Sequence, residues 1–241
     1  MCDYKVLSYN EFGSGENILF LHGWGSGKSL WGNLLDLSAD YHIWCVDLWG
    51  FGDTPTPQKV VNSLDYAQGI VDFIENVIKS KVILIGHSFG GKIASIIAAK
   101  TKLVSKLILI ASAGAPRRFS LKRYVAKIKY KRAKKKVELG KVSKSYLNRF
   151  GSSDYKNSSG IMRAILVECV NENIVKLAFK IKVPTLLVWG RQDSTTPLYM
   201  AKTMRKAIKN SSLVVVRGGH FCFLDSNILP TIYKFLESGD D

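Results

Sequence analysis

Ser88 lies where a serine hydroxyl could act as a nucleophile. An apolar run at residues 82–85 leads into the sequence GHSFGG at 86–91 and then into a helix-like stretch. A sharp strand-to-helix turn with the pattern G-x-S-x-G would expose the hydroxyl above a sheet edge, and small neighbours would avoid collisions. The pattern alone leaves open that Ser88 is simply a helix N-cap.

A serine nucleophile needs a neighbouring base, usually a histidine. The chain has four histidines: His22, His42, His87 and His220. His220 follows an apolar run at 213–216 in a glycine-rich loop, whereas His87 precedes Ser88 on the same turn and is expected to point away from its hydroxyl. His220 is therefore the predicted base.

The predicted orienting acid is Asp193, which follows the apolar run at 185–188. In parallel α/β sheets the loops beyond the carboxyl ends of the strands carry the chemistry. The loop after the run at 107–110 contains no carboxylate, so Asp193 is favoured by elimination as well. The resulting order Ser88, Asp193, His220 suits acyl transfer through a Ser-His-Asp arrangement.

Attack on a carbonyl also requires two N–H donors for the oxyanion. We expect these to be the backbone amides of Phe89, directly after the nucleophile, and of Trp24, in the loop HGWG at 22–25. His22 is expected to order this loop through hydrogen bonds.

The sequence GSGKS at 25–29 resembles the end of a phosphate-binding loop and keeps a nucleotide-binding hypothesis open. His22 occupies the position where that motif requires its first glycine. The one acidic candidate for a metal partner at a strand end is Asp47, and we expect Asp47 to brace the loop 50–54 instead.

The elements that would position these residues alternate along the chain. Strands buried on both faces are predicted at 18–21, 42–46, 82–85, 107–110, 185–188 and 213–216, with a further strand at 4–9. Helices are predicted at 30–38, 65–79, 89–100, 198–209 and 227–236, with Asp65 as an N-cap. This alternation predicts an α/β fold with a doubly wound, mostly parallel sheet.

Residues 115–180 break the alternation and contain most of the excess charge. They hold 18 Lys or Arg against four Asp or Glu, in a chain with 35 and 19 overall. Helices are predicted at 118–139 and 161–170. We expect a basic helical lid at 115–180, inserted into a core formed by 1–114 and 181–241.

Five ordered blocks resemble the α/β-hydrolase superfamily: HGWG at 22–25, DLWGFG at 47–52, GHSFGG at 86–91, WGRQD at 189–193 and GHF at 219–221. The resemblance implies a core sheet with a helical lid after the sixth strand of that fold. Ser88 separates the chain from epoxide hydrolases and haloalkane dehalogenases, which carry Asp at the elbow. Trp24 and Trp31 resemble the serine carboxylesterase-like branch, including pimeloyl-carrier-protein methyl ester esterases and haloperoxidase-type esterases.

The sequence thus predicts a serine hydrolase that cleaves a carboxylic ester or related small acyl substrate, with no metal or organic cofactor. Substrate-binding residues are not predicted. The basic run at 127–136 fits a solvated helix, an acidic acyl carrier protein or an anionic membrane surface; nucleic acid is disfavoured because few aromatic residues interrupt it. Alternatives are an esterase for carrier-bound acyl esters and a non-catalytic protein that binds an acidic partner.

The expected location is the cytoplasm. The N-terminus lacks the pattern of a secretory signal, and no apolar run approaches the roughly 20 residues of a membrane span. The four cysteines are far apart and form no C-x-x-C pair, which disfavours a disulfide framework or a zinc site.

Overall fold

The computed structural model describes residues 6–238, apart from the side chains of residues 122, 123, 144 and 148. Within this part of the chain one seven-stranded sheet has the order β1-β3-β2-β4-β5-β6-β7. The strands are β1 (Tyr9–Phe12), β2 (Glu16–Leu21), β3 (Tyr41–Val46), β4 (Val82–His87), β5 (Val104–Ile110), β6 (Thr185–Gly190) and β7 (Ser211–Val216). Among these seven described strands, only β1 runs antiparallel to its neighbour. The predicted doubly wound, mostly parallel α/β fold is confirmed.

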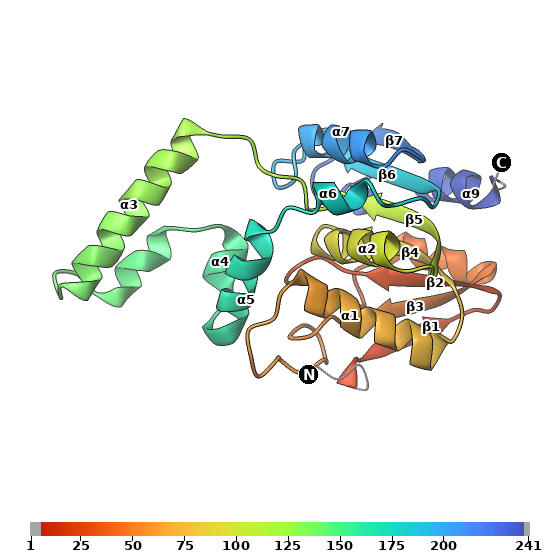
Figure 1. Cartoon of the computed structure of the whole chain (residues 1–241), viewed down its shortest axis with the longest axis horizontal. Coiled ribbons are helices and arrows are strands. Elements are labelled where there is room, and N and C mark those ends of the chain that lie inside the picture. Colours follow the sequence, from red (N-terminus) through yellow and green to blue (C-terminus); the bar gives the residue numbers. More distant parts are fainter. Residues whose placement is uncertain (1–5, 239–241) are drawn as a thin grey trace.

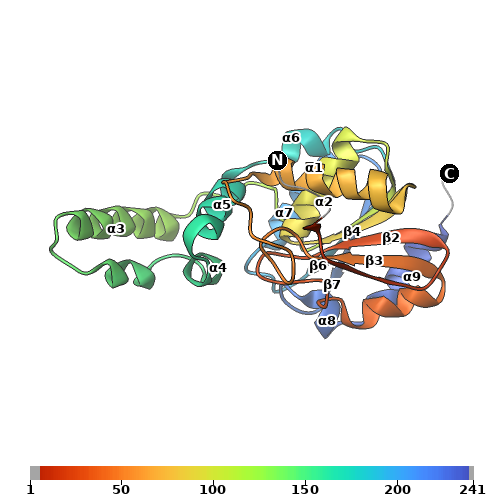
Figure 2. The ribbon, with the colours of Figure 1, turned by 90° about the horizontal axis from the view of Figure 1, so that it is seen from below.

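Helices cover both faces of the sheet (Figures 1 and 2). One face carries α1 (Ser63–Phe73) with a π-helical turn (Ile74–Ile78), α2 (Phe89–Lys100), α6 (Val175–Ala178) and α7 (Leu198–Ala207). The other carries the 3-10 helix η2 (Gly32–Ala39), α8 (Cys222–Asp225) and α9 (Leu229–Glu237). The sheet is therefore the middle of three layers.

Strand β2 shows why these apolar runs become central strands. Leu19 and Leu21 belong to the core on the α1 and α2 face, whereas Ile18 and Phe20 belong to the core on the opposite face. Successive side chains point to opposite faces of a strand, so an uninterrupted apolar run fills both cores. All four side chains are fully buried.

Two local predictions near the N-terminus are wrong. The first strand is β1, Tyr9–Phe12, because its pairing with β3 begins at Tyr9; of the predicted strand 4–9, residues 4 and 5 lie outside the described part. Helix α1 begins before Asp65 because Asn62 is its N-cap. Asn62 accepts hydrogen bonds from the amides of Leu64 and Asp65, while the Asp65 carboxylate accepts the Asn62 N–H, which completes a capping box.

The chain leaves the sheet after β5 and returns at β6. Between them lie α3 (Leu121–Glu138), the 3-10 helix η4 (Lys144–Arg149), α4 (Ser153–Asn157), α5 (Gly160–Asn171) and α6. The insertion follows β5, the fifth strand of the described part of the chain. Helix α6 packs on α2 and α7, whereas α3 packs on η4 and extends away from the sheet (Figures 1 and 2). No helix within residues 6–238 has the length and apolar character needed to cross a bilayer.

Candidate active site

Ser88 occupies the sharp turn between β4 and α2. Its φ of 51° lies in the left-handed region, which a side-chain-bearing residue adopts only under strain. Two backbone hydrogen bonds hold this turn: the Ser88 N–H donates to the Ile110 carbonyl at 3.0 Å, and the Ala113 N–H donates to the Ser88 carbonyl at 2.9 Å. Although Ser88 stands at the N-cap position of α2, its side chain makes no capping hydrogen bond. The hydroxyl is therefore free for another partner.

The glycines of the motif are required by close backbone contacts. A Cβ at Gly90 would lie 1.9 Å from the carbonyl oxygen of Leu21, and one at Gly86 would lie 2.6 Å from the carbonyl oxygen of Gly90. Neither backbone oxygen can yield without moving the sheet or the helix. The small residues around Ser88 thus allow α2 to begin tightly against β2 and β4.

The structure brings the predicted nucleophile, base and acid together. His220 Nε2 lies 2.9 Å from Ser88 Oγ, and His220 Nδ1 lies 2.9 Å from Asp193 Oδ2. Asp193 follows β6 and His220 follows β7, so neighbouring parallel strands deliver both side chains to the sheet edge above Ser88. With a proton on Nδ1 donated to Asp193, Nε2 is free to accept the hydroxyl proton of Ser88.

Asp193 is held as a carboxylate by several donors. Oδ1 accepts the backbone N–H groups of Thr195 and Thr196 at 2.8 and 2.9 Å. Burial by itself raises the pKa of Asp193, but the hydrogen bond and charge of His220 together with the bonds from Thr196 outweigh it, so the pKa is lowered. The acid therefore remains ionised at neutral pH.

Thr196 is a site residue that the sequence analysis missed. Its Oγ1 lies 2.8 Å from Asp193 Oδ2, 2.9 Å from the Ala111 carbonyl oxygen and 3.3 Å from His220 Nδ1. A hydroxyl has one proton, so Asp193 and Ala111 share it as acceptors. Thr196 thus connects the acid loop to the end of β5. The sequence signal for this role is its spacing: Thr196 follows Asp193 by three residues, close enough to bond the Asp193 carboxylate.

His87 acts on the histidine loop, not on Ser88. Its Nε2 lies 3.0 Å from the carbonyl oxygen of His220, which makes it a donor to that loop. The ring is almost completely buried, and this burial, aided by repulsion from His220, lowers the pKa of His87 from 6.5 to about 3. A neutral His87 therefore fixes the backbone of His220 without adding a charge to the site.

The loop at 22–25 approaches the nucleophile as expected. Trp24 and Phe89 both line the cavity beside Ser88, and their rings pack edge to face with centroids 5.4 Å apart. Phe89 is the first residue of α2, where backbone N–H groups have no intrahelical acceptor. His22 orders the loop by hydrogen bonds to the Gly23 carbonyl at 2.8 Å and from the Leu48 N–H at 3.0 Å. This role of His22 was predicted.

Lys28 and Asp47 hold neighbouring loops together. Asp47 Oδ1 accepts the Lys28 N–H, its Oδ2 accepts the Asp53 N–H at 3.0 Å, and the Lys28 ammonium lies 2.6 Å from the Asp53 carboxylate. The predicted bracing by Asp47 is confirmed. The Lys28 ammonium also lies 3.3 Å from Asp47 Oδ2, so two carboxylates engage the lysine of the sequence GSGKS, which disfavours the nucleotide-binding hypothesis.

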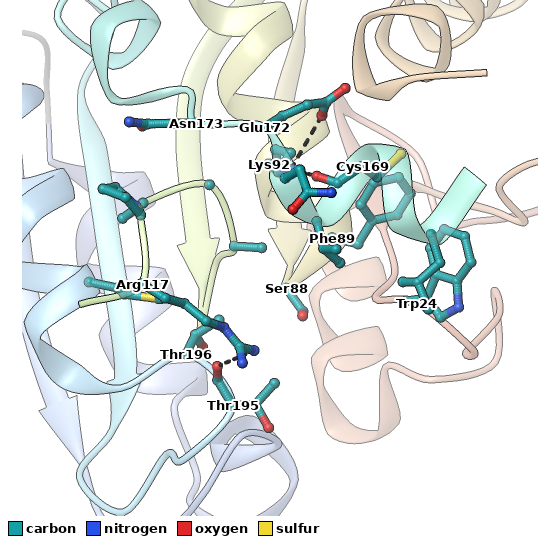
Figure 3. A pocket seen from close by; sticks show the side chains of 18 of the residues that line it. Trp24, Ser88, Phe89, Lys92, Arg117, Cys169, Glu172, Asn173, Thr195 and Thr196 are labelled. Carbon is teal, nitrogen blue, oxygen red and sulfur yellow. Dashed lines mark hydrogen bonds and ion pairs between the residues drawn. The ribbon is translucent and has the colours of Figure 1, made fainter. Parts of the chain in front are cut away.

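A cavity of about 370 Å³ opens beside Ser88 (Figure 3). Its walls come from the elbow, from the segment after β5, from α5 and from the loop after β6. They include Trp24, Phe89, Lys92, Ala113, Gly114, Ala115, Pro116, Arg117, Leu166, Cys169, Val170, Glu172, Asn173, Thr195, Thr196 and Met200. The cavity combines apolar walls with several polar and charged side chains, so it could both accommodate and orient a small organic ligand.

An ion pair between a buried lysine and a half-buried glutamate closes the wall formed by α2 and α5, and no local sequence pattern predicts it. The ammonium of Lys92 donates to the Cys169 carbonyl and lies 3.3 Å from the Glu172 carboxylate (Figure 3). Burial lowers the pKa of Lys92, and attraction to Glu172 opposes this shift. Glu172 also accepts the Ser63 N–H at the start of α1, at 3.0 Å. The pair therefore ties the end of α5 to α1 and α2.

Comparisons with known proteins agree with this architecture. The family model for the alpha/beta hydrolase fold matches residues 16–227. The AB hydrolase superfamily protein YisY of Bacillus subtilis is 28% identical over 92% of this chain and 91% of its own. A pimeloyl-[acyl-carrier protein] methyl ester esterase of Neisseria meningitidis is 27% identical over 93% of this chain and 94% of its own. An esterase from Exiguobacterium antarcticum superposes with a TM-score of 0.76 at 22% identity, covering 96% of both chains.

Proposed function

Because the chain belongs to the α/β-hydrolase fold family, we propose that it is a serine hydrolase that cleaves a carboxylic ester or a related acyl substrate. One observation carries the proposal: the imidazole of His220 lies 2.9 Å from the Ser88 hydroxyl and 2.9 Å from the Asp193 carboxylate. A hydroxyl, an imidazole and a carboxylate in this order form the arrangement that activates serine for attack on a carbonyl carbon.

In the proposed reaction Ser88 Oγ attacks the carbonyl carbon while His220 Nε2 takes its proton. Asp193 holds the imidazole through Nδ1 and stabilises the imidazolium. His220 then gives the proton to the leaving alkoxide, and the acyl group remains on Ser88. A water molecule, deprotonated by His220, hydrolyses this ester and regenerates the serine.

The amides of Trp24 and Phe89 are the proposed oxyanion donors. Two features support them: both residues flank Ser88 in the cavity, and the Phe89 N–H belongs to the first turn of α2. The positive end of that helix adds to the stabilisation of a developing negative charge. We propose no metal or organic cofactor for this chemistry.

Residues 115–180 are the proposed lid unit on the core of residues 1–114 and 181–241. Support comes from α5, whose Leu166, Cys169 and Val170 line the cavity together with Ser88. Apolar lining from this helix favours an acyl group of modest size there. The α3 and η4 part of the insertion extends outward from the sheet (Figures 1 and 2).

Two alternatives remain as candidates. An esterase for acyl-carrier-protein esters is favoured by the basic insertion, and a full-length relative bears that name. A non-catalytic protein that binds an acidic partner is disfavoured by the alignment of Ser88, His220 and Asp193.

We also propose a cytoplasmic location, because Cys45, Cys169 and Cys222 have free thiols, as is usual in a reducing compartment.

The direct test is hydrolysis of p-nitrophenyl esters of increasing chain length by the wild type, Ser88→Ala and Ser95→Ala. Ser95 lies on the same helix and donates to the Gly91 carbonyl at 2.8 Å, so its variant controls for the loss of a buried hydroxyl. The proposal predicts activity in the wild type and Ser95→Ala and its loss in Ser88→Ala. Full activity in Ser88→Ala would overturn it.

A further inference from the structure

The outward part of the insertion, residues 119–150, forms a basic arm made of α3, η4 and their connections. Helix α3 contains nine Lys or Arg and one Glu among its 18 residues. Figures 1 and 2 both show α3 and η4 extending away from the sheet. So many like charges on one helix repel one another, and an anionic partner would relieve that repulsion.

One face of α3 is already occupied. Ala133 is buried, the Tyr130 ring packs edge to face on Phe150 with centroids 5.8 Å apart, and the Tyr130 hydroxyl lies 3.1 Å from the Tyr155 hydroxyl. These contacts fix the rotation of the helix about its axis. The residues on the opposite face must therefore point away from η4 and α4.

The opposite face begins apolar and ends cationic. Leu121, Val125 and Ile128 follow one another at the spacing of a single helical stripe, and Leu121 is 68% and Val125 41% exposed. Phe119, just before the helix, is 81% exposed. The same stripe continues with three exposed cations: Arg132, Lys135 and Lys136. Large apolar side chains exposed together mark an interaction surface.

We propose that the outer face of the basic arm binds an anionic lipid bilayer. Phe119, Leu121 and Val125 would enter the boundary between headgroups and acyl chains, while the cations that follow them contact anionic headgroups. A bilayer surface offers an apolar region and anionic headgroups side by side. A helix that lies in the plane of the surface can insert its apolar side chains and bind the headgroups with its cations. A purely acidic partner matches the cations but leaves the apolar half of the stripe in water.

The arm is joined to the cavity at both of its ends. Residues 113–117 line the cavity and lead directly into Phe119, and the chain returns through α5, which lines the opposite wall. Binding through the arm would therefore place the cavity beside esters dissolved in the bilayer. This consequence for substrate choice rests on the proposed function, whereas bilayer binding itself does not.

The test is co-sedimentation of the full chain with vesicles of phosphatidylcholine, alone or mixed with phosphatidylserine. We expect binding only to the anionic vesicles and its loss with rising salt. The variant Arg132→Gln/Lys135→Gln/Lys136→Gln should weaken binding at least about tenfold. The matched control, Lys202→Gln/Arg205→Gln/Lys206→Gln, removes the same charge from exposed positions of α7 and should bind like the wild type.

A second variant, Phe119→Ser/Leu121→Ser, tests the apolar half of the stripe and should also bind less. Its exposed positions make unfolding a minor concern, and thermal unfolding verifies that the core is intact. Failure of the wild type to bind anionic vesicles would overturn the proposal. So would equal losses in the arm and control variants, or arm-dependent binding of an acidic acyl carrier protein without vesicle binding.

Failure of the proposed function gives a different result. Ser88→Ala should bind anionic vesicles like the wild type while losing hydrolysis of an ester carried in them. If vesicle binding persists but neither protein hydrolyses esters, the lipid surface stands and the enzyme proposal falls. If soluble esters are hydrolysed but vesicles are not bound, the enzyme proposal stands and the lipid-surface proposal falls.

Discussion

Replacement of Thr196 by valine tests whether the site depends on the hydroxyl that supports its acid. Thr196 is buried, and its Oγ1 lies 2.8 Å from Asp193 Oδ2 and 2.9 Å from the Ala111 carbonyl oxygen. Valine keeps the shape but removes the donor. Loss of a hydrogen bond to a charged group costs about 1.5–3 kcal/mol. If the whole of this energy were lost from the stabilisation of the transition state, kcat/KM would fall roughly 10- to 150-fold, which is the largest decrease that we expect.

Thr196→Val should also change how the free energy of unfolding depends on pH. The pKa of Asp193 is lowered in the folded protein, so its stabilisation is present at neutral pH and is lost as the pH falls through the folded-state pKa. Thr196→Val removes one cause of the lowering and raises that pKa. The variant should therefore lose the Asp193 contribution to the free energy of unfolding at a higher pH than the wild type does.

The assays are urea unfolding across the acid range and ester hydrolysis at neutral pH. Thr196→Ser keeps the hydroxyl and should recover most of both losses. Thr203→Val is the control, since Thr203 Oγ1 donates to the Tyr199 carbonyl at 2.9 Å on α7, away from the acid. The reasoning is refuted if Thr196→Val matches the wild type in both assays, or if Thr196→Ser is as impaired as Thr196→Val.

Three further changes follow from single contacts. Gly90→Ala should destabilise the fold by about 1–3 kcal/mol or more, because the new Cβ would lie 1.9 Å from the Leu21 carbonyl oxygen. A variant that is as stable as the wild type in urea unfolding would contradict this. Lys92→Met leaves the half-buried Glu172 carboxylate without its partner and should cost about 1–3 kcal/mol. Part of this loss should be recovered in Lys92→Met/Glu172→Gln, and an equally unstable double variant would argue against the ion pair. Burial lowers the pKa of His87 to about 3, so between pH 6.5 and pH 3 the unfolded state binds this proton and the folded state does not. The free energy of unfolding should therefore decrease as the pH falls from 6.5 to 3. His87→Gln should flatten this slope, and an unchanged slope would contradict the role of His87.

The parts of the fold predictable from sequence are those set by short-range patterns. Helix α2 has the predicted bounds of 89–100 because the elbow glycines and the following apolar residues determine both its start and its packing. The central strands were placed by their apolar runs, although their ends extend by one to three residues where sheet pairing continues. The N-cap at Asn62 was missed although its capping box with Asp65 is visible in the sequence.

The long-range contacts of the site could not be predicted in the same way. Lys92 meets Glu172 across 80 residues and Thr196 meets Ala111 across 85, so neither pairing has a local pattern. Both depend on how the insertion returns to the sheet. The rotation of α3, which decides which of its residues are exposed, likewise depends on Tyr130 packing against Phe150.

The central claim is that Ser88 Oγ is a nucleophile activated by His220, and covalent labelling tests it most directly. The protein is incubated with a fluorophosphonate at neutral pH and the adduct is located by mass spectrometry of its peptides. The account predicts a single adduct on Ser88, slow labelling in His220→Gln and none in Ser88→Ala. An adduct on another residue of the wild type, or equal labelling of Ser88→Ala, would contradict it.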